Sequence, residues 1–139
     1  MKKNILFLCT GNSCRSQMAE GIANHLLPMC TINSAGIEAH GLNPIAVKVM
    51  SDISIPIFHH KSKKITLENL DSFDVVITLC GDANDICLSF KLETEHIHWD
   101  IEDPANFIGN EYDKNNKYSE VRDIIFNKIS DYKDKLSDL

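Results

Sequence analysis

The sequence predicts an α/β fold: a single-domain, three-layer sandwich in which a four-stranded parallel sheet carries helices on both faces. Strand-like and helix-like segments alternate along the chain, which is typical of parallel sheets whose crossovers are helices. The first strand-like run, Ile5–Leu8, is continuously apolar, as expected of a strand buried on both faces. The 139 residues suffice for one buried core, so we assign residues 1–139 to one domain.

The first half of the chain is predicted to contain two strands and two helices. The strands are expected at residues 4–9 and 30–35, and the first helix at residues 16–28. Apolar spacing predicts the core face of that helix: Met18, Ile22, His25, Leu26 and Met29. The second helix is expected to begin at Pro44 with Asn43 as its N-cap, because asparagine caps helices well and proline fits their first turn.

The second half is predicted to contain two further strands, at residues 73–80 and 95–99. Asp82 is the expected N-cap of a helix that follows the first of these strands. Residues 109–117 are polar and are expected to be irregular and mobile. An amphipathic helix at residues 118–136 is expected to close the fold.

The loop between the first strand and the first helix is the expected centre of the site. It reads Cys9-Thr10-Gly11-Asn12-Ser13-Cys14-Arg15-Ser16, with five residues between Cys9 and Arg15. In a strand–loop–helix arrangement, the loop N–H groups and the helix N-terminus converge and form a nest for an anion. Cys9 is therefore expected to be a thiolate nucleophile, and Arg15 to clamp a tetrahedral oxyanion. The nucleotide-binding P-loop is excluded, because it requires a Lys-Ser or Lys-Thr pair.

Residues Cys9–Ser16 resemble the Cys-x5-Arg-Ser loop of the low-molecular-weight phosphatase fold. Residues Cys9–Gly21 and Ser34-Ala35-Gly36 resemble, more specifically, the thioredoxin-coupled arsenate reductases of that fold, which act in arsenic detoxification. The resemblance covers most of the chain, including residues 36–44. It implies that Ser16 donates its hydroxyl to the Cys9 thiolate. It also implies an oxyanion-binding loop made of Thr10, Gly11, Asn12, Ser13, Cys14 and Arg15.

Asp103 precedes Pro104 in the loop after the last expected strand. Asp-Pro is a common turn signal, so propensity alone leaves its role open. The phosphatase-like fold carries its general acid in an Asp-Pro loop near the C-terminus, and the resemblance implies this role for Asp103. Because ligands bind at the carboxyl ends of parallel strands, we expect Cys9, Cys80 and Asp103 to meet at one edge of the sheet.

Cys80 and Cys87 distinguish a reductase from a phosphatase, which has no use for two further thiols. Residues 78–83, with Cys87 beyond them, resemble the redox segment of the reductases. The resemblance implies a relay in which Cys9 attacks arsenate, a Cys9–Cys80 disulfide forms as arsenite leaves, and Cys87 then forms the Cys80–Cys87 disulfide. It also implies that thioredoxin reduces that disulfide. Two buried, inert thiols are the alternative interpretation.

The spacing of Cys80 and Cys87 predicts a conformational step. Seven helical residues rise about 10 Å, whereas the Cα atoms of a disulfide lie within roughly 7 Å. If residues 82–87 are helical when reduced, they must partly unwind to form the disulfide. Residues 88–91 lack the proline expected after the second redox cysteine, which leaves the mobility of this segment open.

The resemblance implies no bound cofactor, because the electrons come from thioredoxin. Members of this type often bind a potassium ion beside the loop. Asn12, Glu20 and Ser34 match its ligands, but Lys63 stands where a carboxylate is expected. We predict that the Lys63 ammonium replaces the cation close to Glu20. The segment around it, residues 59–64, is expected to be a solvated basic loop.

Composition and charge exclude several function classes. The odd number of cysteines argues against a static disulfide framework; they are Cys9, Cys14, Cys30, Cys80 and Cys87. Their spacings do not match zinc sites, so no metal is expected. The net charge of −6 gives no basic patch for nucleic acid. No run is apolar enough to span a membrane and no signal peptide is apparent, so we expect a cytoplasmic monomer.

Two alternative functions remain open. A low-molecular-weight protein tyrosine phosphatase would use the same loop and aspartate, but such enzymes place aromatic residues after the Asp-Pro pair, where this chain has Ala105-Asn106. Weak activity on small aryl phosphates is compatible with this, because phosphate and sulfate mimic arsenate. A non-enzymatic redox sensor would bind an oxyanion and signal through Cys80–Cys87. Arsenate-dependent oxidation of thioredoxin separates these functions.

Overall fold

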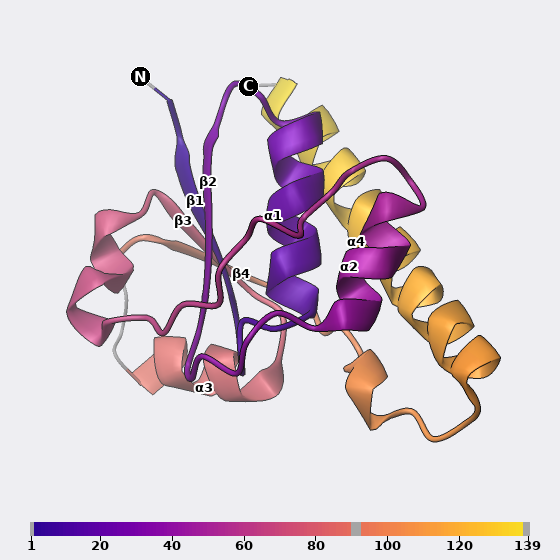
Figure 1. Ribbon diagram of the computed structural model, residues 1–139. Helices are drawn as coiled ribbons and strands as arrows, with labels where there is room; N and C mark the ends of the chain where they lie inside the picture. The colour runs from indigo at the N-terminus through magenta and orange to yellow at the C-terminus, as the bar shows by residue number, and fades with distance from the viewer. Residues whose placement is uncertain (1, 90–92, 138–139) are drawn as a thin grey trace.

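The computed structural model describes residues 2–89 and 93–137 and shows helices on both faces of one parallel sheet (Figure 1). The four strands pair in parallel in the order β2-β1-β3-β4. Their bounds are β1 (Asn4–Cys9), β2 (Thr31–Gly36), β3 (Val75–Thr78) and β4 (Glu95–His98). The predicted fold class is confirmed, and the first strand has the predicted bounds.

The helices are divided between the two faces of the sheet. On one face α1 packs against α4 and α2, while α3 lies on the opposite face, against β1 and β3 (Figure 1). Their bounds are α1 (Arg15–Leu26), α2 (Pro44–Ser51), α3 (Gly81–Ser89) and α4 (Glu111–Ser137). Two short 3-10 helices complete the structure, η1 (Leu67–Ser72) and η2 (Pro104–Asn106).

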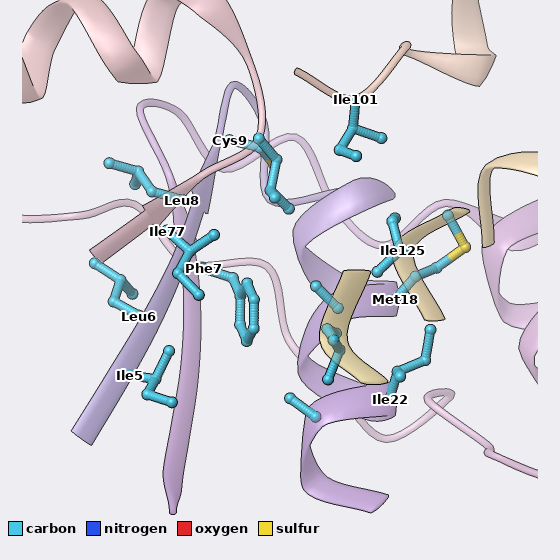
Figure 2. Close-up of a cluster of buried hydrophobic side chains, with 14 of the residues drawn as sticks. Ile5, Leu6, Phe7, Leu8, Cys9, Met18, Ile22, Ile77, Ile101 and Ile125 are labelled. Atoms are coloured by element: carbon cyan, nitrogen blue, oxygen red, sulfur yellow. The ribbon is translucent and has the colours of Figure 1, made fainter. Parts of the chain in front are cut away.

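The core is built on β1, whose side chains alternate between the two faces. Phe7 points toward α1 and α4, where Met18 and Ile125 lie (Figure 2). Leu6 and Leu8 lie on the other side of the strand (Figure 2). All five side chains are buried, and burying one of this size contributes about 1.5–3 kcal/mol. The continuous apolar run thus corresponds to a strand covered on both faces.

The core face of α1 differs in part from the predicted one. Met18 and Ile22 are buried as predicted, but His25 and Met29 are exposed. The helix ends before position 29, so Met29 lies outside its periodic face. Leu27, directly after the helix, is buried instead.

α4 begins earlier than the predicted start at residue 118. The prediction that residues 109–117 are irregular is wrong from Glu111 onward. The Asn110 side chain accepts a hydrogen bond from the Asp113 N–H at 2.8 Å, and its carbonyl accepts one from Lys114 N–H at 2.9 Å. Acidic residues in the first turn also favour this start. Neither α4 nor any other helix of the described residues is long and apolar enough to cross a membrane.

Candidate active site

The loop that joins β1 to α1 is held by its carbonyl groups, which leaves its backbone N–H groups without protein acceptors among the described residues. The carbonyl oxygens of residues 9–11 accept hydrogen bonds from three N–H groups of residues 37–40, at 2.9–3.0 Å. Among the described residues, no protein acceptor was found for the N–H groups of residues 10–14. N–H groups without protein acceptors in a loop that precedes a helix N-terminus are typical of an anion site, which agrees with the nest expected from the sequence.

Asn12 supports the loop from inside. Its φ of 46° is left-handed, a conformation that asparagine tolerates. Its buried amide donates to Ser16 Oγ at 2.8 Å and to Ser34 Oγ at 3.0 Å. Its Oδ1 accepts from Lys63 N–H at 2.7 Å. Gly36 permits the close approach of the loop, because a Cβ at position 36 would lie 2.5 Å from the backbone nitrogen of Asn12.

Ser16 contacts the sulfur of Cys9. The Ser16 Oγ lies 2.8 Å from the Cys9 Sγ, and both residues are buried. Because Ser16 Oγ accepts the Asn12 amide, its own O–H is free to donate to the sulfur. The two groups therefore lie within hydrogen-bond distance, and the role of Ser16 toward Cys9 stays a prediction.

A cavity of about 230 Å³ lies over the loop. It is lined by Cys9, Thr10, Gly11, Ser13, Cys14, Arg15, His40, Asn43, Asp103 and Ala105. The predicted nucleophile, clamp and general acid therefore share one cavity, whereas the Asn12 side chain points elsewhere. His40 and Asn43 were not among the predicted site residues. A larger cavity of about 410 Å³ between β4 and α4 is lined by Trp99 and other residues but by no cysteine, so thiol chemistry belongs to the smaller one.

Arg15 and Asp103 form an ion pair in the lining of this cavity. The Arg15 guanidinium is 3.5 Å from Asp103 Oδ2 and donates to the carbonyl of Ile101 at 3.0 Å. Asp103 also caps η2, because its Oδ1 accepts the N–H of Ala105 at 3.0 Å. The carboxyl is thus fixed opposite the loop, where the sequence predicted a general acid.

Cys80 lies at the same edge of the sheet, at the N-terminus of α3. The hydroxyl of Thr10, the residue after Cys9, donates to Cys80 Sγ at 3.2 Å. The Ala83 N–H donates to the same sulfur at 3.4 Å. The prediction that Asp82 is the N-cap is wrong: α3 begins at residue 81, and the Cys80 sulfur takes the capping position. The Cys80 sulfur thus lies where the N–H groups of the first turn of α3 point.

Cys87 is buried within α3 and is only 1% exposed. Burial, with a smaller effect of the Cys80 charge, raises the pKa of the Cys87 thiol to about 11. Both cysteines are free, and residues 82–87 are helical in this reduced state. Because residues 82–87 are helical, a Cys80–Cys87 disulfide can form only if this helix partly unwinds, as predicted. Of residues 88–91, the first two complete α3, and residues 90 and 91 lie outside the described residues.

The two remaining cysteines are also buried: Cys14 lines the same cavity as Cys9, whereas Cys30 lies outside it. Burial and then the nearby Asp103 raise the pKa of Cys14, and burial raises the pKa of Cys30. Both thiols therefore stay protonated at neutral pH, and a protonated thiol is a poor nucleophile.

Glu20 has the cationic neighbour that the sequence predicted. Lys63 Nζ lies 3.6 Å from Glu20 Oε1, and Ser34 Oγ donates to the same oxygen at 2.6 Å. Lys63 is half exposed, so the ion pair is weak on its own. That it replaces a potassium ion stays a prediction. In the part of the chain that the structure describes, no cluster of metal-ligating side chains is found.

Residues 59–64 are mostly exposed, as expected of a solvated loop, but the His60 side chain is an exception. Its side chain is 8% exposed, lies 3.4 Å from Glu20 and hydrogen-bonds Gln17 Oε1 at 3.0 Å. Burial lowers the pKa of His60, and the Glu20 carboxylate partly opposes this shift. The His60 side chain therefore packs against α1, and sequence reasoning missed it because a segment of histidines and lysines carries no sign of burial.

Fold and site together define a family. The model of the family described as "Low molecular weight phosphotyrosine protein phosphatase" matches residues 4–138. The chain belongs to this family. Within it, the protein named arsenate reductase of Bacillus subtilis is 47% identical over 131 residues, 94% of each chain. That of Bacillus licheniformis is 50% identical over 129 residues, 92% of this chain and 93% of the relative.

Solved structures agree with this assignment. One described as an arsenate reductase in the phosphate binding state has a TM-score of 0.76 and 31% identity, covering 96% of this chain and 98% of that one. An arginine phosphatase with a phosphorylated active site serine has a TM-score of 0.82 and 25% identity, covering 96% and 95% of the two chains.

Proposed function

We propose that this protein is an arsenate reductase that uses Cys9, Cys80 and Cys87, with thioredoxin as its electron donor. The main support for this proposal is the position of the Cys80 thiol. The hydroxyl of Thr10, the residue next to Cys9, donates a hydrogen bond to Cys80 Sγ at 3.2 Å. A phosphatase would need no thiol there. The relatives named arsenate reductase support the same reaction. The chemistry suits the cytoplasm, where thioredoxin keeps thiols reduced.

The first step joins arsenic to the loop cysteine. A tetrahedral oxyanion can accept hydrogen bonds from the N–H groups of the loop and from the forked guanidinium of Arg15. The Cys9 thiolate attacks arsenic and forms a sulfur–arsenic bond. An arsenic-bound hydroxyl leaves as water, with a proton from Asp103. Arsenic stays in the +5 state in this step, and phosphate and sulfate compete for the same place because they share its shape and charge.

The second step reduces the arsenic. The Cys80 thiolate attacks Cys9 Sγ, a disulfide bond forms and the sulfur–arsenic bond breaks. The electron pair of that bond remains on arsenic, which leaves in the +3 state as arsenite. Cys87 then loses its proton and attacks Cys80, which releases Cys9 as a thiolate. The dithiol of thioredoxin reduces the Cys80–Cys87 disulfide by exchange.

A coupled assay of arsenate-dependent thioredoxin oxidation tests this function. We expect steady turnover by the native chain and none by Cys80→Ser or Cys87→Ser. Cys30→Ala is the matched control, because Cys30 is also buried but lies outside the site. Turnover of phosphotyrosine alone would instead support a phosphatase. A protein that turns over neither substrate but still binds the anion would be a redox sensor.

A weak phosphatase activity is the second candidate. Phosphate ester cleavage needs only a nucleophile, a clamp and an acid, and Cys9, Arg15 and Asp103 line one cavity. Ala105 provides no aromatic wall beside it, so small aryl phosphates are the expected substrates. Hydrolysis of p-nitrophenyl phosphate should require Cys9 and be unchanged in Cys87→Ser. Equal loss in both variants would contradict this.

A further inference from the structure

His40 lies directly on the glycine of the anion loop. Its backbone N–H donates to the Gly11 carbonyl at 2.9 Å. A Cβ added to Gly11 would lie 2.3 Å from His40 Nδ1, so the imidazole occupies the space that a side chain at position 11 would need. The imidazole lines the same cavity as Cys9 and Arg15. Its position depends on the absence of a side chain at Gly11.

The cavity has little positive charge for a doubly charged anion. Among the described residues that line it, Arg15 and His40 are the two that can carry a positive charge, and Asp103 opposes them. The Arg15 guanidinium is shared, since it lies 3.5 Å from Asp103 and donates to the Ile101 carbonyl at 3.0 Å. Lys63 does not line the cavity and is paired with Glu20 at 3.6 Å. Beyond Arg15, the loop N–H groups and the N-terminus of α1, His40 is therefore the group at the cavity wall that can add a second full positive charge.

We infer that His40 is a specificity-determining residue whose imidazolium binds the second negative charge of a tetrahedral dianion in the loop. The inference rests on the proposed function in one respect, that the natural substrate is such a dianion. It assigns His40 no part in the bond-making steps. Because the contact is the same before and during the reaction, it lowers the KM and leaves kcat unaffected.

The test compares two unreactive tetrahedral anions, sulfate with two charges and perchlorate with one, at constant ionic strength. Each is titrated for protection of Cys9 against iodoacetamide, followed by mass spectrometry of the Cys9 peptide. In His40→Ala, the sulfate concentration for half-protection should rise about tenfold, as expected for one lost charge-assisted hydrogen bond. The perchlorate value should change about twofold or less. His40→Lys should restore sulfate binding.

Two controls make the result decisive. His40→Gln keeps the packing against Gly11 but carries no charge, so its sulfate binding should be as weak as that of His40→Ala. His25→Ala removes an exposed histidine at the far end of α1 and should change nothing. Equal effects on both anions, or native binding by His40→Gln, would overturn the inference.

The assay needs no turnover, so the inference can fail or hold independently of the proposed reaction. If the native chain reduces arsenate but the His40 variants bind sulfate as the native chain does, only the inference about His40 is wrong. If the native chain does not reduce arsenate but shows the charge-dependent effect of His40, only the proposed function falls. In the reductase assay, His40→Ala should raise the arsenate KM about tenfold with kcat unchanged; a lower kcat at the native KM would contradict the inference.

Discussion

The Cys9 sulfur stands at the end of a directed chain of buried hydrogen bonds. The Lys63 N–H fixes the orientation of the Asn12 amide, because only Oδ1 can accept it. The Asn12 amide nitrogen therefore donates to Ser16 and Ser34. This leaves the Ser16 O–H free to point at Cys9 Sγ, 2.8 Å away. The chain orients the hydroxyl before any substrate arrives.

Replacing Ser16 tests this orientation. Ser16→Ala removes the donor to a charged sulfur, a contact worth about 1.5–3 kcal/mol, so arsenate turnover should fall about tenfold or more. The alkylation rate of Cys9 at neutral pH should fall with it. Ser51→Ala, at the exposed end of α2, is the control. An unchanged alkylation rate in Ser16→Ala would show that the hydroxyl does not act on the sulfur.

Lys63 is the residue that should determine the response to potassium. Native activity is expected to be the same in potassium and sodium chloride, because the ammonium already lies beside Glu20. Lys63→Asp removes that charge and supplies a carboxylate beside Glu20, so it should create a severalfold potassium stimulation. Turnover at equal ionic strength is the measurement. A large potassium effect on the native chain would contradict the predicted replacement.

At the scale of elements, α3 is the part that must change shape. Cys80 caps this helix and Cys87 lies inside it, so helical geometry separates their Cα atoms by about 10 Å. Disulfide formation therefore requires unwinding. In the Cys80–Cys87 disulfide form, amide hydrogen exchange across residues 81–89 should be at least about tenfold faster than in the reduced form. Equal protection of α3 in both forms would exclude the unwinding, and β1 serves as the internal control.

The pKa of Cys87 reports whether α3 is closed. In the folded reduced protein its alkylation should have a midpoint near pH 11, because burial raises its pKa to about 11. In urea the midpoint should return to about 8.5. The folded state thus holds a proton that the unfolded state releases between these values. Cys87 therefore stabilises the fold below about pH 8.5, and this contribution is lost as the pH rises toward 11.

The measurement is alkylation of the Cys87 peptide as a function of pH, with and without urea. The free energy of unfolding should also fall less steeply between pH 9 and 11 in Cys87→Ala than in the native chain, because the variant lacks this proton. A native midpoint equal to that in urea would mean that the thiol is already open to solvent.

Elements with an apolar pattern or a known cap could be predicted, and those without could not. β1 follows from its apolar run, and the Asn43 cap of α2 is confirmed by its bonds to two N–H groups. The first turns of α4 could not be predicted, because residues 111–117 have no apolar stripe. They are held by an ion pair at 2.6 Å between Lys117 and Glu102, the residue before Asp103. The capping of α3 by the Cys80 sulfur could not be predicted, because cysteine is not an expected capping residue.

At the scale of the whole molecule, the site gathers segments that are distant in the sequence. The rule that parallel strands end at one edge predicted the meeting of Cys9, Cys80 and Asp103. Cys9 and Asp103 line one cavity, and Cys80 is held by Thr10. The places of His40 and His60 could not be predicted, because each depends on a loop that folds back over residues far from it in the chain.

The central claim is that oxidation passes from Cys9 to Cys80 and only then to Cys87. The most direct measurement is a single exposure of reduced Cys87→Ser to excess arsenate, with arsenite counted and disulfides mapped by mass spectrometry. The relay predicts about one arsenite per protein molecule and a trapped Cys9–Cys80 disulfide, as expected when an exchange step has no second thiol to complete it. Repeated turnover, or arsenite release without that disulfide, would contradict it.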